Sequence, residues 1–411
     1  MSGSPPARTS RTGSSARIGL FAAFASLGVT ASFVPAVLPA AERAMSADLS
    51  TAVPVLFAGL LVGVLLSGPL LVRRPTRLTL ILGSGLQALA IVVGAWAGSA
   101  PVFLAAAALA GLGFGLVEAA GSVAAKAAST GSATGLLSAL MGTVAVCAAL
   151  TPLVIAAGAG TGMLPVLSIL CVVPLTTVVL LLGSGAARPG SAPSTPLTPS
   201  TPSRNLRALI PLLPFALALP LYVGVETVLS GWSAVIPERA LTLDPSAAAL
   251  GTTAFWALMA VGRFGAAALR RRDVRPLVIL ATGTLGAAAL MTAAGLLIGS
   301  SPVWALAALA ASVVLLAPSY GLILGLALDR LDPARSAAAT GTLVACGAVG
   351  GTFVPTLILL IGRDPVASVT FVVSAALCAL VPVLVALAVL TSTVVDSVDG
   401  GLASDAEVGS F

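Results

Sequence analysis

The sequence has 411 residues, of which 58% are hydrophobic and only 8% are charged, and its formal net charge at pH 7 is +6. Soluble globular proteins carry about 25% charged residues, so this composition excludes that class and indicates an integral membrane protein that crosses the bilayer several times. The positive net charge does not indicate nucleic-acid binding, because the basic residues stand in short clusters between apolar runs.

Twelve apolar runs are long enough to cross a bilayer, for which a helix needs about 20 residues. A polar, basic segment at residues 1–17 precedes them, and we expect it to be disordered. The runs form two groups of six, at residues 18–183 and 208–390, so the predicted fold class is an all-α integral membrane protein. The predicted spans are 18–40, 52–72, 78–97, 102–125, 134–157, 163–183, 208–235, 247–269, 276–298, 302–328, 337–361 and 366–390.

The segment between the two groups, residues 184–207, is rich in Pro, Ser and Thr. Such a composition cannot bury apolar surface, so we expect a flexible or polyproline-like linker. Residues 391–411 follow the last span as an acidic tail for which no structure is predicted. The sequence thus predicts two six-helix halves joined by a linker.

The basic residues predict the orientation of the chain. With alternating spans, all of the 20 Lys and Arg residues except Arg43, Arg239 and Arg363 fall on the side that holds both termini. Because cytoplasmic loops carry an excess of Lys and Arg, we expect both termini to be cytoplasmic and the protein to lie in the plasma or inner membrane.

The two halves resemble each other in sequence. RLTLILGSGLQALA from Arg77 parallels RPLVILATGTLGAAA from Arg275, and SATG at Ser132 parallels AATG at Ala338. These matches pair span three with span nine and span five with span eleven in the same orientation. A parallel repeat about an axis along the membrane normal is one architecture of membrane transporters.

Several kinds of chemistry are absent from the sequence. Histidine is missing, which removes the commonest proton shuttle and metal ligand. The four cysteines lie in apolar runs at unrelated spacings, so they are interpreted as buried hydrophobic side chains. No nucleotide-binding G-x-x-x-x-G-K-[ST] loop occurs. We therefore expect no metal, no cofactor and no catalytic residue.

Two carboxylates lie inside predicted spans. Glu226 shares one helical face of span seven with Tyr222 and Ser230, and Glu118 shares a face of span four with Ser122 and two glycines. Inserting an ionised group near the bilayer centre costs roughly 2.5–3.5 kcal/mol of free energy on insertion scales, so an acid inside a span is a candidate functional residue. We expect both acids to face a central cavity and to exchange protons; the alternative is a structural acid that is hydrogen-bonded to a neighbouring helix.

Aromatic residues are scarce, at 4% of the chain. Tyr222, Trp256 and Tyr320 lie in the second half and could form a wall of the cavity. Trp232 and Trp304 are alternatively membrane-interface anchors, the commoner role of membrane Trp. Tyr320 follows Pro318 in a span that the proline interrupts, which favours a place at the cavity.

Two arginine-rich connections follow spans two and eight. The second reads GRFGAAALRRRDVRP from Gly262, and its counterpart is SGPLLVRRPTR from Ser67. Small residues allow close helix packing, and the arginines could pair with carboxylates or helix ends in one conformation only. The alternative is that they merely set the topology. The predicted cytoplasmic gate residues are Gly262, Arg263, Gly265, Arg270, Arg271, Arg73 and Arg74.

These connections, with twelve spans in two halves, resemble the major facilitator superfamily (MFS). The aspartate of that family's loop signature is missing from the first copy, where Leu71 and Val72 precede Arg73. FWALMAVGRFGAAALRRR and the preceding YVGVETVLSGWSAVIPERAL are most similar to the fucose:proton symporter branch. The resemblance implies a functional acid in span four, which Glu118 matches, and one in span one, which is absent from the predicted span 18–40.

The sequence therefore predicts a secondary active transporter that works by alternating access and acts as a monomer on a small organic solute. The predicted coupling is to protons, which a buried carboxylate would take up and release. Scarcity of amides, with Gln87 the only glutamine and Asn205 the only asparagine, favours efflux of a small molecule or metabolite over the alternative, proton-coupled uptake of a sugar-like solute. A membrane-embedded enzyme is a remote alternative, because no His and no Asp lies within a span. A sensor or scaffold would need a larger soluble domain.

Overall fold

The computed structural model describes residues 10–128, 134–159, 161, 164–183, 212–328, 330 and 333–408, and within these residues it is helical without a strand. The bounds of the first half are α1 (Ser10–Met45), α2 (Ala52–Arg73), α3 (Thr76–Ala95), α4 (Ala100–Ala127), α5 (Thr134–Ala159), the 3₁₀ helix η1 (Leu164–Cys171) and α6 (Val172–Gly183). Those of the second half are α7 (Leu213–Gly231), α8 (Val235–Leu241), α9 (Pro245–Arg270), α10 (Pro276–Leu297), α11 (Pro302–Leu316), α12 (Ser319–Leu328), α13 (Pro333–Gly362) and α14 (Ser368–Val408).

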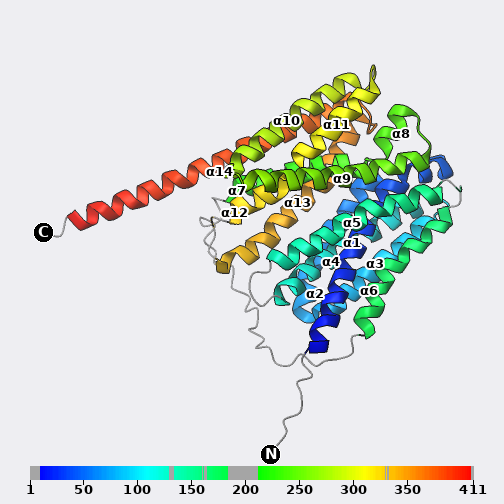
Figure 1. The fold of residues 1–411 in the computed structure, drawn as a ribbon, viewed down its shortest axis with the longest axis horizontal. Helices are drawn as coiled ribbons and strands as arrows, with labels where there is room; N and C mark the ends of the chain where they lie inside the picture. Colours follow the sequence, from blue (N-terminus) through cyan, green and yellow to red (C-terminus); the bar gives the residue numbers. More distant parts are fainter. Residues whose placement is uncertain are drawn as a thin grey trace, which may run out of the picture.

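The predicted number of spans is confirmed, since twelve helical segments of the described chain are long and apolar enough to cross a membrane. The ends of the chain differ from expectation. Helix α1 begins at Ser10, so residues 10–17 are helical, whereas residues 1–9 lie outside the described part. Helix α14 continues to Val408 and projects beyond the bundle (Figure 1), so the acidic tail is largely helical. The linker 184–207 also lies outside the described residues.

The helices form two halves that lie next to each other in Figure 1, the first from blue to cyan-green and the second from green to red. Each half has the same internal arrangement: α1 packs on α5 as α7 packs on α13, and α3 packs on α4 as α10 packs on α11. The predicted parallel repeat is thereby confirmed. The halves meet along α2 with α13 and along α5 with α9, and α1 also packs on α9.

Glycines set the close packing inside the first half. A Cβ atom added at Gly111 would lie 1.8 Å from the carbonyl oxygen of Leu56, and one added at Gly115 would lie 2.3 Å from that of Leu60. Only glycine permits backbones to approach this closely. The glycine face predicted on span four therefore packs against α2.

Two spans of the second half are shaped by breaks in the helix. The proline-interrupted span ten ends as α11 at Leu316 and resumes as α12 at Ser319, as the position of Pro318 predicted. Span seven is shorter than expected, because α7 ends at Gly231 and a turn leads into the short helix α8. We call the end of the bundle that holds α8 and the α1–α2 connection the far side, and the opposite end the terminus side.

Candidate functional site

The carboxylate of Glu226 on α7 faces the guanidinium of Arg263 on α9, with 3.8 Å between Oε1 and Nη2. The Glu226 side chain is 20% exposed and that of Arg263 is 44% exposed. The Nε–H of Arg263 donates a long hydrogen bond of 3.4 Å to the carbonyl oxygen of Ala317, at the break between α11 and α12. A permanent cation and a carboxylate thus stand together within the membrane-spanning part of the second half.

The two tyrosines of the predicted site lie beside this pair. Tyr222 is fully buried one helical turn before Glu226, and its ring centroid lies 6.2 Å from that of Tyr320 on α12. The break at Pro318 starts a new helix at Ser319, and so brings Tyr320 toward α7. The structure thus places Tyr222, Glu226 and Tyr320 close together.

Glu118 reaches the same region from the first half. It lies half-buried on α4, and both Glu118 and Glu226 are within electrostatic reach of the Tyr320 hydroxyl. Because α4 and α7 belong to different halves, the structure brings the two predicted acids to one region between the halves. Ser122, one turn beyond Glu118, is also half-buried.

The remaining predicted cavity residues have different surroundings. Trp256 on α9 makes an edge-on contact with Phe255, at 5.4 Å between ring centroids, and its indole Nε1 is buried without a hydrogen-bond acceptor among the described residues. The hydroxyl of Ser230 lies 3.5 Å from the carbonyl oxygen of Thr227, within its own helix. The indole N–H of Trp256 is therefore an unused hydrogen-bond donor among the described residues, whereas the Ser230 hydroxyl contacts a carbonyl oxygen of its own helix.

The predicted gate residues do not form one cluster. Arg263 points to Glu226 instead of joining the loop arginines, of which Arg271, Arg73 and Arg74 are exposed at the terminus side. The side chain of Arg270 lies outside the described part. A Cβ added at Gly262 would lie 2.1 Å from the carbonyl oxygen of Val314, so this glycine packs α9 on α11, while Gly265 faces open space.

A second charged centre, which the sequence reasoning missed, lies at the far side. Arg239 on α8 donates through Nη2 to Glu42 on α1 at 2.9 Å and to Asp48 at 3.2 Å, and through Nη1 to Asp364 at 3.0 Å. Glu42 is only 11% exposed and also accepts a hydrogen bond from the Leu49 backbone N–H. Arg239 thus joins a carboxylate of the first half to one of the second.

The charge of this centre affects the ionisation of its members. Burial alone would raise the pKa of Asp48, but hydrogen bonds from Ser50 and the Arg239 charge hold the pKa of this carboxyl below its ordinary value. Burial likewise opposes the charge of Arg239, but Glu42 raises the pKa of the guanidinium above its ordinary value. Both groups are therefore ionised at neutral pH.

A second arginine repeats the connection in the opposite direction. Arg43 on α1 pairs with Glu238 on α8 at 3.0 Å and lies 3.7 Å from Asp244, so here the cation belongs to the first half. Together we call Glu42, Arg43, Asp48, Glu238, Arg239, Asp244 and Asp364 the far-side network.

Trp232 also joins the two halves at the far side. It is fully buried, and its Nε1–H donates to the Ser50 carbonyl oxygen at 3.1 Å across the halves. The interpretation of Trp232 as an interface anchor is wrong for this reason, whereas Trp304 is 71% exposed on the outer surface, as an anchor would be. A Cβ at Gly231 would lie 2.2 Å from the Val53 side chain, so the halves touch here without space between them.

The far-side connections have unusual backbone conformations. Of the non-glycine residues with positive φ in the described chain, three lie in these connections: Ser46, Thr242 and Arg363, at 49°, 53° and 58°. Such conformations are uncommon for residues with a Cβ. These residues lie in the same connections as Asp48, Glu238 and Asp364.

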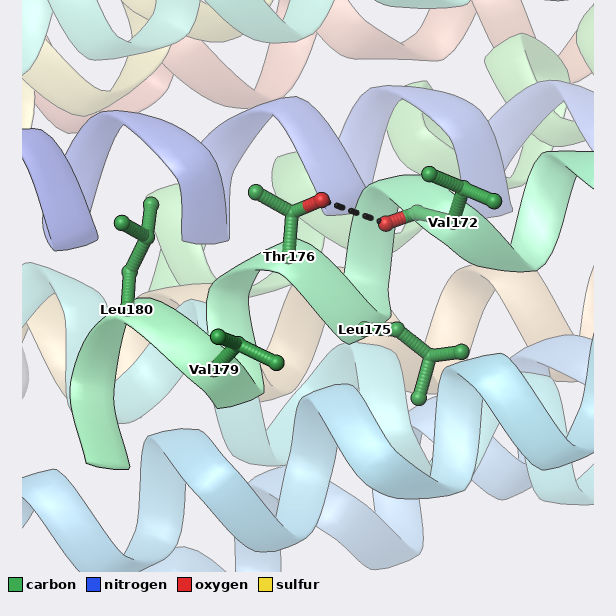
Figure 2. Close-up of a pocket in the computed structure, with 5 residues that line it drawn as sticks. All are labelled: Val172, Leu175, Thr176, Val179 and Leu180. Atoms are coloured by element: carbon green, nitrogen blue, oxygen red, sulfur yellow. Dashed lines mark hydrogen bonds between the residues drawn. The ribbon is translucent and has the colours of Figure 1, made fainter. Parts of the chain in front are cut away.

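A shallow concavity on the outer surface is not part of this site. Figure 2 shows that its lining side chains all come from α6, and the hydroxyl of Thr176 among them donates to the Val172 carbonyl oxygen of the same helix at 2.7 Å. The other lining residues are Leu175, Val179 and Leu180, which are exposed as lipid-facing side chains would be.

Twelve spans in two repeated halves define a multi-pass membrane protein with the MFS fold. Solved structures of transporters have this fold: a D-xylose-proton symporter (TM-score 0.76, 16% identity, 90% of this chain and 96% of that chain) and a bacterial homolog of the human lysosomal transporter Spinster, inward-facing and unoccupied (TM-score 0.72, 15% identity, 92% and 99%). A peptide transporter, POT, in complex with sulfate is also similar (TM-score 0.68, 16% identity, 90% and 94%). No family model and no curated protein matches the sequence.

Proposed function

We propose that the chain is a secondary active transporter that moves a small organic solute by alternating access and couples this movement to protons. The observation that carries the proposal is the interior pair of Glu226 and Arg263. Tyr320, which lies beside this pair, is within electrostatic reach of both Glu226 and Glu118, the latter from the other half. The ion pair between an interior carboxylate and a permanent cation can be broken when the carboxylate takes up a proton or when a solute takes its place.

The far-side network supports alternating access. Its ion pairs join the halves at one end of the bundle, and interfaces of this kind can be broken when two rigid halves rock about a central site. We infer that the structure corresponds to the state closed at the far side, with the solute path leading to the terminus side. In the opposite state, Glu42 and Arg239 separate.

The polarity of the interior supports the proposed solute class. The only glutamine, Gln87, packs beside Gly113 between α3 and α4 and is fully buried there, so it does not contribute an amide to the region between the halves. Sugars need several polar partners, and this supports export of a less polar molecule over uptake of a sugar-like solute. The resemblance to the fucose:proton symporter branch remains a prediction.

The proposed orientation places the terminus side in the cytoplasm, because the basic residues gather there. Single cysteines near Arg272 and near Arg239 test it in intact cells with an impermeant maleimide. Labelling near Arg239 alone supports the orientation, whereas labelling near Arg272 alone reverses it and with it the assignment of export.

Coupling is tested with purified protein in proteoliposomes that carry a pH-sensitive dye and an imposed proton gradient. A panel of solutes is added with and without a proton uncoupler. We expect at least one solute to move protons through the wild type, and Glu226→Gln to abolish this proton flux while the variant still inserts and purifies. Undiminished proton-coupled flux in Glu226→Gln would contradict the role of this carboxylate.

A further inference from the structure

We propose that Arg263 is the binding site for an anionic group of the solute, so that the transported class is small organic carboxylates with an apolar body. This inference rests on the proposed function and specifies its solute. It starts from the hydrogen bonds that Arg263 lacks. A guanidinium has five N–H donors and no acceptor.

In the described part of the chain, Arg263 uses one of these donors, Nε–H, in the long bond to Ala317. Its Nη2 atom is 3.8 Å from Glu226, beyond hydrogen-bond distance, and the side chain is 44% exposed. The four Nη hydrogens thus have no acceptor among the described residues. Arginine does not deprotonate in proteins, so this cation stays charged while its nearest described carboxylate, Glu226, makes no hydrogen bond to it.

A second donor-only group lies on the same face of the same helix. Trp256 precedes Arg263 by seven residues, two helical turns, and its buried Nε1–H has no acceptor in the described chain. Indole nitrogen donates and does not accept. Two donor-only groups on one face of α9 favour a ligand that brings acceptor atoms, as a carboxylate does.

The surroundings indicate the rest of the ligand. The rings of Tyr222 and Tyr320 lie 6.2 Å apart beside the pair, and Phe255 packs edge-on against Trp256. Aromatic rings offer apolar contact area. A carboxylate with a hydrocarbon or aromatic body fits this combination better than a sugar or a cation, because a cation would be repelled by Arg263.

Glu226 then acts as the internal competitor of the solute. The titratable groups around it are Tyr222 on its own helix, Arg263 on α9, Tyr320 on α12, Cys378 on α14 near Tyr222, and Glu118 on α4 near Tyr320. α13, which also packs on α7, carries Cys346, and α1 carries Glu42 and Arg43, both held in the far-side network. Protonation of Glu226 frees Arg263 for the solute carboxylate.

The experiment measures the thermal stability of the purified full-length protein with acetate, succinate, benzoate or phenylacetate, each paired with its uncharged amide. We expect a carboxylate with an apolar body to stabilise the wild type, and its amide not to do so. Arg263→Gln should raise the half-maximal concentration by about 10- to 100-fold, the range of one charge-assisted hydrogen bond. Arg263→Lys should restore part of the affinity, and Glu226→Gln should lower the half-maximal concentration.

Arg272→Gln, the same substitution at an exposed loop arginine, is the matched control and should leave binding unchanged. Arg263→Gln combined with Glu226→Gln leaves no unpaired carboxylate at this site. This double variant should also bind weakly, and it takes the place of Arg263→Gln in the assay if the single variant is unstable. Equal stabilisation by carboxylates and amides, no stabilisation by any carboxylate, or wild-type affinity in the double variant would each overturn the proposal.

The same samples in proteoliposomes separate this inference from the proposed function. Carboxylate binding that depends on Arg263, without flux of any bound carboxylate, would refute transport and leave the anion site in place. Flux of an uncharged solute that is unaffected by Arg263→Gln would refute the anion site and leave transport in place.

Discussion

Replacing Arg239 by Gln should shift the protein toward the state that is open at the far side. Arg239 binds Glu42, which is 11% exposed, and Asp48 and Asp364, which are both more than half exposed. Breaking a fully buried pair costs about 3–5 kcal/mol and an exposed pair about 0.2–1 kcal/mol. We assign about 2 kcal/mol to the partly buried pair with Glu42 and about 0.5 kcal/mol to each of the others.

The total of about 3 kcal/mol corresponds to about a 100-fold shift toward the state that is open at the far side, since about 1.4 kcal/mol changes an equilibrium tenfold. The shift is measured as the rate at which a maleimide labels Val53→Cys in purified protein whose four native cysteines have been replaced. Val53 is 1% exposed and lies against Gly231 of the other half. Labelling should therefore be slow in the parent and much faster with Arg239→Gln.

The matched control is Arg363→Gln, which removes an exposed arginine of the same side and should leave the labelling rate unchanged. Equal rates in the parent and in Arg239→Gln would show that the network does not hold the halves together. A faster rate in both arginine variants would point to a general effect of charge on the reagent.

Two further outcomes follow from the structure. Gly111→Ala should lower the stability of the purified protein by about 1–3 kcal/mol, the usual cost of overpacking, because its Cβ would overlap the Leu56 carbonyl oxygen. The control Gly85→Ala, at a glycine that faces open space, should not lower it. Equal melting temperatures of the two variants would contradict the close α2–α4 packing. Because the pKa of Asp48 is lowered in the folded protein, its contribution to stability is present above its ordinary pKa of 3.8 and is lost as the pH falls through the lowered value. The difference in melting temperature between the parent and Asp48→Asn should therefore persist at about pH 5 and disappear only in stronger acid, and a difference already absent at about pH 5 would contradict the role of Asp48.

The spans and the two interior acids could be predicted because they depend on local information. About 20 apolar residues define each span, and one carboxylate in such a run is conspicuous. Tyr222 and Ser230 share a face with Glu226 by helical spacing alone. The partner of Glu226 was not predicted, because Arg263 was interpreted together with the loop arginines that follow it seven residues later.

The far-side network could not be predicted from spacing, since Arg239 and Glu42 are 197 residues apart. A usable signal was nevertheless present. The arginines that depart from the basic bias of the other side are Arg43, Arg239 and Arg363, and two of them form the interhalf ion pairs. Helix α8 was missed because seven residues directly after a span are not distinguishable from its continuation.

The crossed arrangement of the two arginines bears on biogenesis. Arg43 lies in the half that is synthesised first and pairs with the carboxylate of Glu238 from the half that is synthesised second. Its sequence neighbour Glu42 pairs with Arg239, which also belongs to the later half. A nascent first half therefore presents an adjacent acid and base whose final counterions do not yet exist. These two residues can therefore reach their final ion pairs only after the chain has been synthesised through Asp244, and the additional pair of Arg239 with Asp364 forms later still.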